Sequence, residues 1–563
     1  MRVILRTHNE QPREPLATLV QPTLAQVQAL LPPDATGLLA LDTETTGLEA
    51  HNPKQDLFAI GFADARGCWA LDLRGADTCV LDYVRQQLGR RPLTAFNVVF
   101  DGAWLQRWTG TWLDWRYCSL SAFKQLSNEG WAGQRWNLEV AQREVLGWAS
   151  SNKDAIHDLL SAAGLSKAQM DQLPPEHVLR YCASDADAAW QLVDVLTAAA
   201  APWPEFADYH ERVFMTECKL LVENQFAGIP IDQRRLAKCH VTLLADIALA
   251  KTAFLSNPDV ARHIARLMDE AHGLWMARRP ADTTKAGKPA VAYARWLASE
   301  PTTDGVWNIN SKPQLASLFF DTLKFKVLKT TPTGRPVIDK QVLPRLGDPG
   351  KLLNKYNLLV KRRGYVEAVI AKSARDDMLH PQFKSVGTVT TRLGGSGGLN
   401  LQQMPKDVHL LGAFVPPPGH VLVQADAEAL EPVLLAAFSR DPTMLRLYGP
   451  GAKANDIYLF VGSHMPGLME AIRQHYDPDA PTPEGVAAAK RHCKRERTIA
   501  KVTSLACGYG AGVRKIHQTL VMSGIDVSTS QVAAIHAAYW RLFAGVARWQ
   551  DQLQSVWRST GGW

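Results

Sequence analysis

Two acidic residues follow the first strongly apolar stretch of the chain, at a spacing that suits a metal ion. Asp42 comes directly after the apolar run Leu38–Leu41, and Glu44 follows two residues later. If the run is a β-strand that continues through both acids, their carboxylates point to one face and repel each other unless a cation lies between them. Hard divalent cations prefer such oxygen ligands. The pair therefore predicts a metal site, with the polar end of an ordinary strand as the alternative.

Two later segments each supply one more acid. The sequence Ala-Phe-Asn-Val-Val-Phe-Asp follows a strand-like stretch, and it is expected to put Asp101 on the turn after that strand, four residues beyond Asn97. Further along, a helical pattern puts Tyr181 and Asp185 on one face, because residues four apart are neighbours on a helix. Asp187 is expected behind the metal ligands or on the surface. The additional carboxylates are what a site for two metal ions needs.

These segments together resemble a known family of nucleases. Asp-x-Glu, Asn-x-x-x-Asp and Tyr-x-x-x-Asp, in this order over residues 38–190, resemble the motifs of the DnaQ-like 3′→5′ exonucleases that carry tyrosine in the third motif. The resemblance implies that Tyr181 orients the attacking water and that Asn97 and Leu48 contact the terminal nucleotide. It also implies four carboxylates that bind two Mg²⁺ or Mn²⁺ ions: Asp42, Glu44, Asp101 and Asp185. In phosphodiester hydrolysis one ion activates the water and the other stabilises the leaving oxygen, at a separation of roughly 3.5–4 Å.

The second half of the chain resembles the family A DNA polymerases, the group of bacterial DNA polymerase I and its phage relatives. The segments that carry the resemblance, in order, are Gly228–Asp232, Asn308–Leu315, Thr391–Arg392, Leu399–Pro405, Val421–Glu431, Asp456–Tyr458 and Arg497–Gly510. By this resemblance, three residues would contact primer-template and the nascent base pair from the minor groove: Arg392, Asn400 and Gln402. Hydrogen-bond acceptors there are similar for every base pair, so these contacts would test pair geometry and not sequence. Thr391 stands where the family has glycine.

The resemblance extends to part of a polymerase palm. The run Val421–Ala425 is expected to be a palm strand that ends at Asp426, the implied first metal ligand of the polymerase site. Glu431 occupies the position of the family glutamate that excludes the ribose 2′-hydroxyl, although Pro432 replaces the usual arginine. The family also carries a second palm segment, His-Asp-Glu, and none follows here. We therefore expect the polymerase site to be incomplete and the polypeptide alone to polymerise poorly.

Four positions recur every four residues and so lie along one face of a helix: Arg497, Lys501, Leu505 and Tyr509. The resemblance implies that Arg497 and Lys501 neutralise the triphosphate of an incoming nucleotide, and that Tyr509 stacks near the template base. Leu505 stands where the family has phenylalanine or tyrosine, which predicts weaker stacking on the nucleotide.

Four hypotheses on function remain open. The first is the amino-terminal portion of a proofreading replicative polymerase, completed by a separate chain that bears the missing palm strand, as in a split phage gene; it predicts an exposed apolar palm edge. The second is an autonomous 3′→5′ exonuclease whose inactive polymerase remnant clamps DNA. The third is a DNA-binding scaffold without activity, and the fourth is a truncated product. The expected partners are DNA primer-template, single-stranded 3′ ends and, for a polymerase, dNTPs.

The composition is that of a large globular protein. With 563 residues, 46% of them hydrophobic and 21% charged, the chain is too long to fold around a single hydrophobic core, so several domains are expected. Its net charge of +7 permits a polyanionic partner. The eight cysteines form no Cys-x-x-Cys pair, so neither a zinc site nor a disulfide framework is indicated. No apolar run approaches the roughly 20 residues that span a bilayer, and the N-terminus lacks a signal-peptide core, so we expect a cytoplasmic protein, in the host cytoplasm if it is phage-encoded.

Three apolar runs predict strands and alternate with helical stretches up to about residue 120: Leu38–Leu41, Leu57–Phe62 and Leu93–Phe96. Helical periodicity dominates most of the remainder. The expected fold class is an α/β exonuclease domain with an RNase H-like mixed sheet, followed by a mostly helical thumb and the partial palm and fingers of a right-hand polymerase. The expected divisions are an N-terminal extension at 1–30, the exonuclease domain at 31–203, a thumb-like region at 208–385, a partial palm at 386–440 and fingers at 441–563.

Overall fold

The computed structural model describes residues 11–127, 136–149, 152–280, 291–388, 390–427, 429–448 and 456–560. Within them the chain forms two compact units. One combines residues up to 239 with residues 365–422, and the other combines residues 240–364 with residues 423–560. The first ten residues of the predicted N-terminal extension lie outside the described residues, and its remainder holds a short strand and a helix.

A six-stranded mixed sheet forms the centre of the first unit. Its strands are β1 (Ala17–Leu19), β2 (Leu39–Thr45), β3 (Leu57–Asp64), β4 (Gly67–Asp72), β5 (Leu93–Ala95) and β6 (Trp115–Cys118), in the spatial order β1-β4-β3-β2-β5-β6. β2 pairs antiparallel with β3 and parallel with β5, so it lies in the interior of the sheet. The three apolar runs that predicted strands are confirmed, because they coincide with β2, β3 and β5.

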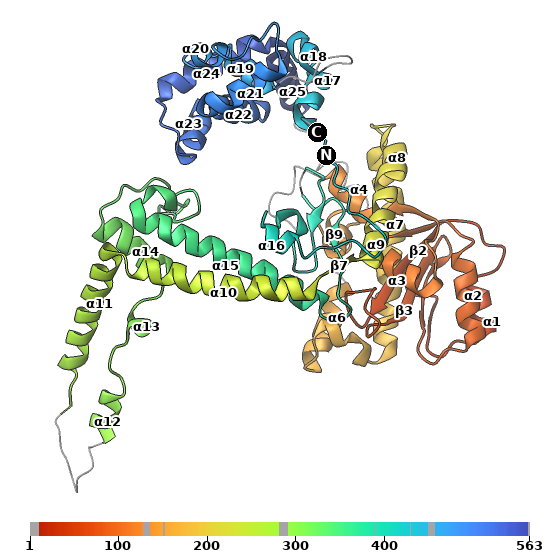
Figure 1. The fold of residues 1–563 in the computed structure, drawn as a ribbon. Helices are drawn as coiled ribbons and strands as arrows, with labels where there is room; N and C mark the ends of the chain where they lie inside the picture. The colour runs from red at the N-terminus through yellow and green to blue at the C-terminus, as the bar shows by residue number, and fades with distance from the viewer. Residues whose placement is uncertain are drawn as a thin grey trace. The chain divides into compact units, whose positions relative to one another are not determined.

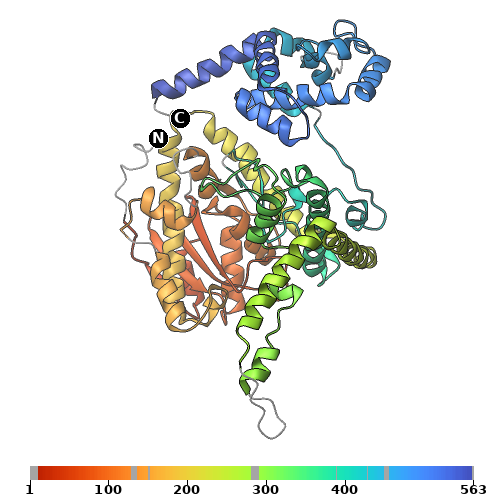
Figure 2. The ribbon, with the colours of Figure 1, turned by 90° about the vertical axis from the view of Figure 1, so that its left-hand side faces the viewer.

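Helices cover both faces of this sheet (Figure 1), and Figure 2 shows the same layers from the side. They are α1 (Leu24–Leu30), α2 (Thr78–Leu88), α3 (Val98–Thr109), α4 (Ser119–Leu126), α5 (Leu138–Glu144), α6 (Asn152–Ala162), η1 (Lys167–Gln172) and α7 (Pro175–Ala200). Side chains alternate between the two faces of a strand. Large residues such as Leu41 and Phe62 pack against α1, α2 and α3, whereas small residues such as Ala40 and Ala70 face α6 and α7. The small face lets α7 pack close to the sheet.

Further elements complete the first unit: α8 (Phe206–Tyr209), η2 (His210–Met215), α9 (Thr216–Ala227), β7 (Ile229–Pro230), β8 (Met378–Leu379), β9 (Phe383–Lys384), β10 (Gly394–Gly395), η5 (Leu401–Gln403) and α16 (Val408–Leu411). Two contacts tie the later segment to the layers around the sheet. Lys124 Nζ donates to the Val386 carbonyl at 2.8 Å, and the His51 ring stacks on His380 with centroids 4.1 Å apart.

The stretch between residues 208 and 380 is mostly helical, as predicted. Its helices beyond α9 are α10 (Gln233–Leu255), α11 (Pro258–Ala277), α12 (Val291–Leu297), α13 (Thr303–Val306), α14 (Lys312–Ala316), η3 (Ser317–Thr322), η4 (Leu343–Arg345) and α15 (Gly347–Ser373). α11 begins where Asn257 caps it by accepting from the backbone of Asp259 and Val260, and Pro258 occupies its first position.

Residues 423–560 form a helical body with its own apolar core. Its helices are α17 (Leu430–Ser439), α18 (Pro442–Tyr448), α19 (Ile457–Gly462), α20 (Met469–Arg473), α21 (Pro483–His492), α22 (Lys494–Gly508), α23 (Val513–Met522), α24 (Thr529–Leu542) and α25 (Ala544–Thr560). Phe460, Tyr539 and Phe543 are buried at its centre. The segment 497–508 is helical as predicted, because it lies within α22.

One predicted strand is wrong. Residues 421–425 form no strand in the structure as far as it is described, and the side chains of Val421, Leu422 and Val423 are 80%, 61% and 85% exposed. A strand is stabilised by hydrogen bonds to the backbone of a neighbour. No described segment pairs with this one, so its apolar pattern is not sufficient to make it a strand.

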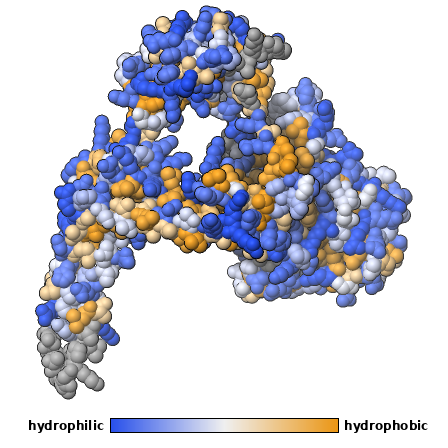
Figure 3. Space-filling model, in the orientation of Figure 1, coloured by the Kyte–Doolittle hydropathy of each residue, from blue (hydrophilic) through white to orange (hydrophobic). Residues whose placement is uncertain are grey.

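Hydrophilic side chains cover most of the face drawn in Figure 3, as expected of a chain with 21% charged residues. Among the described helices, no single one is long and apolar enough to cross a bilayer. α10 and α11 reach the required length and hydropathy only as a pair, and this pair is bent by 74°.

Candidate active site

Three elements of the first unit bring the four predicted carboxylates to one cavity. Asp42 and Glu44 belong to β2, Asp101 to α3 and Asp185 to α7. The cavity has a volume of about 380 Å³. The other residues predicted for this site also line it: Leu48, Asn97 and Tyr181. Every residue named in the three exonuclease-like motifs therefore meets at one place.

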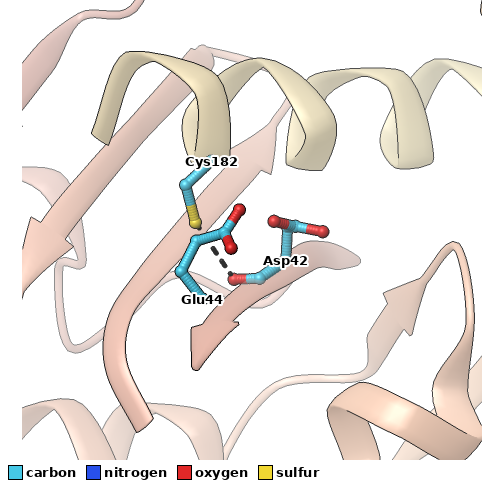
Figure 4. Close-up of side chains that lie close together, drawn as sticks. All are labelled: Asp42, Glu44 and Cys182. Atoms are coloured by element: carbon cyan, nitrogen blue, oxygen red, sulfur yellow. Dashed lines mark hydrogen bonds between the residues drawn. The ribbon is translucent and has the colours of Figure 1, made fainter. Parts of the chain in front are cut away.

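β2 and α7 approach closely at the site because β3 carries a glycine there. Gly61 is the register partner of Asp42, and a Cβ at this position would overlap the Cys182 carbonyl on α7. With the helix this close, Cys182 Sγ donates to the Asp42 carbonyl oxygen at 3.5 Å. Figure 4 shows Asp42, Glu44 and Cys182 meeting between the strand and the helix, and ligand atoms of all three lie within 4.8 Å of one another.

Asp101 lies in the first turn of α3, and not on a turn between elements as predicted. The helix begins at Val98, directly after Asn97, so the connection from β5 is shorter than expected. The carboxylate is 4% exposed. Thr43 holds it in place, because its N–H and hydroxyl both donate to Asp101 Oδ1, at 3.1 and 2.7 Å. Asp101 is thereby fixed to the strand that carries the first two acids.

Tyr181 and Asp185 lie one turn apart on α7, as predicted. Gln142 of α5 is 1% exposed, and its Nε2 donates to Asp185 Oδ1 at 3.1 Å. Asp187 is completely buried and lies outside the cavity lining. The backbone N–H and Nε of Arg13 donate to its carboxylate at 2.8 and 2.6 Å. Of the two places predicted for Asp187, the surface is therefore wrong.

Burial and mutual repulsion disfavour ionisation of these carboxylates in the absence of a cation. Burial raises the pKa of Glu44 to about 8 and that of Asp101 to about 7. The pKa of Asp42 lies well above its ordinary range, because this group is buried and faces the other three carboxylates. Burial and the neighbouring carboxylates also raise the pKa of Tyr181, so its phenol keeps its proton. Cations would relieve this repulsion, and carboxylate oxygens suit Mg²⁺ or Mn²⁺. The residues present therefore fit a metal centre.

A second cavity of about 370 Å³ adjoins the first and shares Leu48, Asn97 and Phe100 with it. Two cations and an aromatic ring are among its lining residues: Lys124, Lys384 and Trp136. Lys384 belongs to β9, so the segment 365–422 contributes to this wall. The two cavities therefore adjoin at the residues that they share, and Lys124 and Lys384 give the second cavity positive charge.

Another set of predicted residues lies on α17 and α22, except for Tyr509, which was predicted on the helix face but follows directly after the end of α22. The Tyr509 hydroxyl donates to Glu431 Oε1 at 2.7 Å. Together with Leu505, these two residues line a cavity of about 250 Å³ whose other walls are mostly apolar. Residues that lie 78 positions apart in the sequence are thus brought together, as the predicted nucleotide site requires.

Arg497 and Lys501 lie on α22 beside the ring of Tyr458, with Arg497 Cζ 5.3 Å and Lys501 Nζ 5.7 Å from its centroid. Arg497 also donates Nε and Nη2 to Asp456 Oδ2, at 3.0 and 2.8 Å, and Lys490 Nζ lies 3.2 Å from the same oxygen. Although burial opposes it, hydrogen bonds from Arg497 lower the pKa of Asp456. A triphosphate would therefore compete with Asp456 for these cations.

Of the three residues predicted to bind primer-template, Arg392 follows Thr391, Asn400 directly precedes η5, and Gln402 lies within η5. Thr391 has a φ of 59°, in the left-handed region that favours glycine, which agrees with the glycine found there in the family it resembles. The Asn400 side chain accepts from the Gln402 N–H at 3.0 Å and caps η5. Asp426 is exposed and lines none of the three cavities above.

Several residues at the carboxylate site were not predicted from the sequence, among them Thr43, Gly61, Gln142 and Lys167. The sequence offered a signal for Gly61, because a glycine inside a predicted strand often marks a place where another backbone segment approaches closely. For Thr43 the only signal in the sequence was its position between Asp42 and Glu44. Gln142 and Lys167 come from segments without a motif, and only the folded chain brings them to the site.

Two protein-family models match this chain. The model described as 3′-5′ exonuclease matches residues 24–200, and the model described as DNA polymerase family A matches residues 298–562. The first range holds all four carboxylates of the cavity, and the second holds α22 with its predicted nucleotide-binding residues.

Similar proteins are DNA polymerases of phage and bacteria. The DNA polymerase of Bacillus phage SP01 is 21% identical over 492 residues, which cover 84% of this chain and 50% of the phage protein. DNA polymerase I of Aquifex aeolicus is 23% identical over 530 residues, which cover 93% of this chain and 77% of that protein. The chain thus spans half the length of the phage relative.

A solved structure shares the fold. The POL domain of Pol1 from M. smegmatis, in complex with DNA primer-template and dNTP, superposes with a TM-score of 0.68 at 17% identity, over 97% of this chain and 79% of that one. The predicted fold class, an α/β domain with a mixed sheet followed by a helical polymerase region, is therefore confirmed.

Proposed function

From the premise that the chain carries a 3′-5′ exonuclease domain followed by a family A DNA polymerase domain, we propose that it removes nucleotides from the 3′ end of DNA. The observation that carries this proposal is the convergence of four carboxylates on one cavity: Asp42, Glu44, Asp101 and Asp185. The raised pKa values of Asp42, Glu44 and Asp101, and the oxygen ligands that all four residues offer, favour two divalent metal ions, which would activate water and stabilise the leaving 3′ oxygen.

The neighbouring residues have distinct tasks in this proposal. The protonated phenol of Tyr181 lines the cavity and can donate a hydrogen bond to the attacking water. Thr43 and Gln142 hold Asp101 and Asp185 by hydrogen bonds, so these ligands keep their positions as substrate enters. Buried hydrogen-bond partners of this kind are what fixes metal ligands in other sites.

The adjoining cavity supports a single-stranded 3′ end as the substrate. Trp136 offers a ring on which a base can stack, and Lys384 offers a charge for a phosphate. Stacking and backbone charge together bind single strands without reading their sequence. Leu48 and Phe100 stand where the two cavities join, so the terminal nucleotide would pass between them to the carboxylates.

The exonuclease proposal is tested with a single-stranded oligonucleotide labelled at its 5′ end, incubated with the purified chain and Mg²⁺ or Mn²⁺. We expect a ladder of shortened labelled products, which a 3′→5′ direction requires, and no products in EDTA. The Asp42→Ala/Glu44→Ala double variant should leave the strand intact. An intact strand with the wild-type chain and either metal would refute the proposal.

For the polymerase region we propose that Arg497 and Lys501 bind the triphosphate of a dNTP, with Glu431, Leu505 and Tyr509 around its sugar and base. The cavity that the last three residues line supports this assignment, and the two cations lie next to Tyr458 on its wall. Primer-template would contact Arg392, Asn400 and Gln402, and Asp426 would bind a metal ion.

A second candidate is an exonuclease whose polymerase region only holds DNA. The segment before Asp426 favours it, because Val421 and Val423 are exposed and form no strand there. The same exposed apolar segment is what the hypothesis of a palm completed by a separate chain expects. Primer extension by the Asp42→Ala/Glu44→Ala variant separates these readings without interference from degradation. Lengthened primers support polymerase activity, and unchanged primers with detectable binding of primer-template support the second candidate.

A further inference from the structure

We infer that Lys167 is a substrate-binding residue of the exonuclease site and contacts the phosphodiester that is cleaved. The inference rests on the proposed exonuclease function. Lys167 lies outside all three motifs, yet it lines the cavity that holds the four carboxylates. Among the lining residues, it is the only cation.

The chain fixes Lys167 at the cavity wall through the turn between α6 and α7. Gly164 has a φ of 66°, and the N–H of Leu165 donates back to Leu160 at 2.8 Å, which ends α6. Ser166 then starts η1 through a reciprocal pair of hydrogen bonds with Gln169. Lys167 is therefore the first residue of a turn that is held at its beginning.

The other end of η1 is anchored in the core. Met170 is 2% exposed and Leu173 is 5% exposed, and both pack in the apolar cluster between the sheet and α7. Met170 also lines the same cavity as Lys167. Because both ends of the turn are held, the Lys167 side chain lies at the cavity wall although it is exposed to solvent.

The positive charge of Lys167 indicates the kind of ligand that it can bind. After burial, Lys167 exerts the largest effect on the pKa of Glu44, which it lowers. Nevertheless, no described residue forms a hydrogen bond or an ion pair with its Nζ. A lysine that served only to offset the carboxylates would be expected to pair with one of them at short distance. An unpaired ammonium at the wall of the cavity remains available for an anion from outside.

The phosphodiester is the anion that the proposed reaction brings to this place. Hydrolysis adds charge to the phosphoryl oxygens, and a positioned lysine stabilises such charge where it develops. Metal ions held by the carboxylates would lie on one side of the phosphate, and Lys167 would donate to a non-bridging oxygen from another side. The lysine ammonium is compact, whereas the arginine guanidinium is planar and larger. Arginine at position 167 would therefore keep the positive charge but would not place its donors in the same way.

The test compares Lys167→Ala and Lys167→Arg with a matched control, Lys54→Ala. Lys54 is an exposed lysine of the same unit that lines none of the cavities described above. Single-stranded DNA with Mg²⁺ is the substrate, and kcat, KM, the half-saturating Mg²⁺ concentration and Tm are measured for each variant. We expect Lys167→Ala to lose kcat/KM by on the order of 100-fold, Lys167→Arg to recover about a tenth or more of it, and Lys54→Ala to change it less than about twofold.

Metal dependence separates substrate binding from a structural role. Because the lysine repels cations, its removal should leave the half-saturating Mg²⁺ concentration unchanged or lower, with an unchanged Tm. The inference is overturned if Lys167→Ala retains the wild-type kcat/KM, or if its loss comes with a lower Tm and a higher Mg²⁺ requirement that arginine does not correct. A wild-type chain without exonuclease activity would instead refute the proposed function itself, and the two failures are therefore distinguishable.

Discussion

Replacing Glu44 by glutamine should stabilise the metal-free protein while it abolishes metal-dependent activity. Glu44 is 7% exposed, and burial raises its pKa to about 8 from an ordinary value of 4.5. Below pH 4.5 the carboxyl is protonated in both the folded and the unfolded state, so it has no effect on the free energy of unfolding. As pH rises, only the unfolded state releases the proton freely, and the folded state loses stability until the pH passes the folded pKa.

The size of the effect follows from the two pKa values. Between pH 4.5 and pH 7 the cost grows by about 1.4 kcal/mol for each pH unit, which gives about 3 kcal/mol at pH 7. Glutamine has nearly the same shape and no charge to bury. In EDTA at pH 7, the free energy of unfolding of Glu44→Gln should therefore exceed that of the wild type by up to about 3 kcal/mol.

Urea denaturation followed by tryptophan fluorescence measures this difference, since Trp69 and Trp104 are buried in the same unit. The gain should vanish at pH 4.5, and Mg²⁺ should stabilise the wild type more than the variant, because a ligand stabilises the state that binds it. Glu176→Gln, at an exposed position on α7, is the control and should change stability by less than about 0.5 kcal/mol. A variant that is less stable than wild type at pH 7, or a gain that is independent of pH, would refute the reasoning.

Three further predictions test other parts of the account. Tyr181→Phe should lower the exonuclease kcat by roughly 10- to 100-fold with little change in KM, and an unchanged kcat would remove the proposed role of the phenol. Arg13→Ala should destabilise the first unit by about 3 kcal/mol in urea denaturation, because it removes the cation that is paired with the buried Asp187; a loss below about 1 kcal/mol would contradict the importance of this ion pair. Asp456→Asn should tighten dNTP binding by on the order of tenfold in equilibrium titration, since Arg497 and Lys490 lose a competing anion, and weaker binding would show that Asp456 helps to position them.

The elements that carry the motifs could be predicted because local patterns determine them. The apolar runs before Asp42 and around Leu57 specify strands, and the four-residue spacing of Tyr181 and Asp185 specifies a helix face. In both cases the candidate site residues lie on a strand or helix that the spacing of apolar and polar residues already predicts. The carboxylates at the cavity were predicted from these elements together with the resemblance to the exonuclease motifs.

The rest depends on contacts between distant segments. Nothing near Gln142 in the sequence indicates that it donates to Asp185, and nothing near Lys167 indicates that it reaches the same cavity. The strand expected at 421–425 fails for a related reason, because strand formation requires a pairing partner that the apolar pattern does not reveal. Asp101 was predicted on a turn after the strand, but it lies in the first turn of α3, because this helix begins directly after Asn97.

The central claim is that the carboxylate cavity hydrolyses DNA, and single-turnover cleavage of a 5′-labelled single strand in Mg²⁺ tests it most directly. The comparison is between Asp185→Asn and Asp194→Asn, the same substitution at two positions of α7, of which only the first lines the cavity. Asp185→Asn should slow cleavage by at least on the order of 100-fold, whereas Asp194→Asn should cleave at nearly the wild-type rate. Equal rates for the two variants would contradict the central claim.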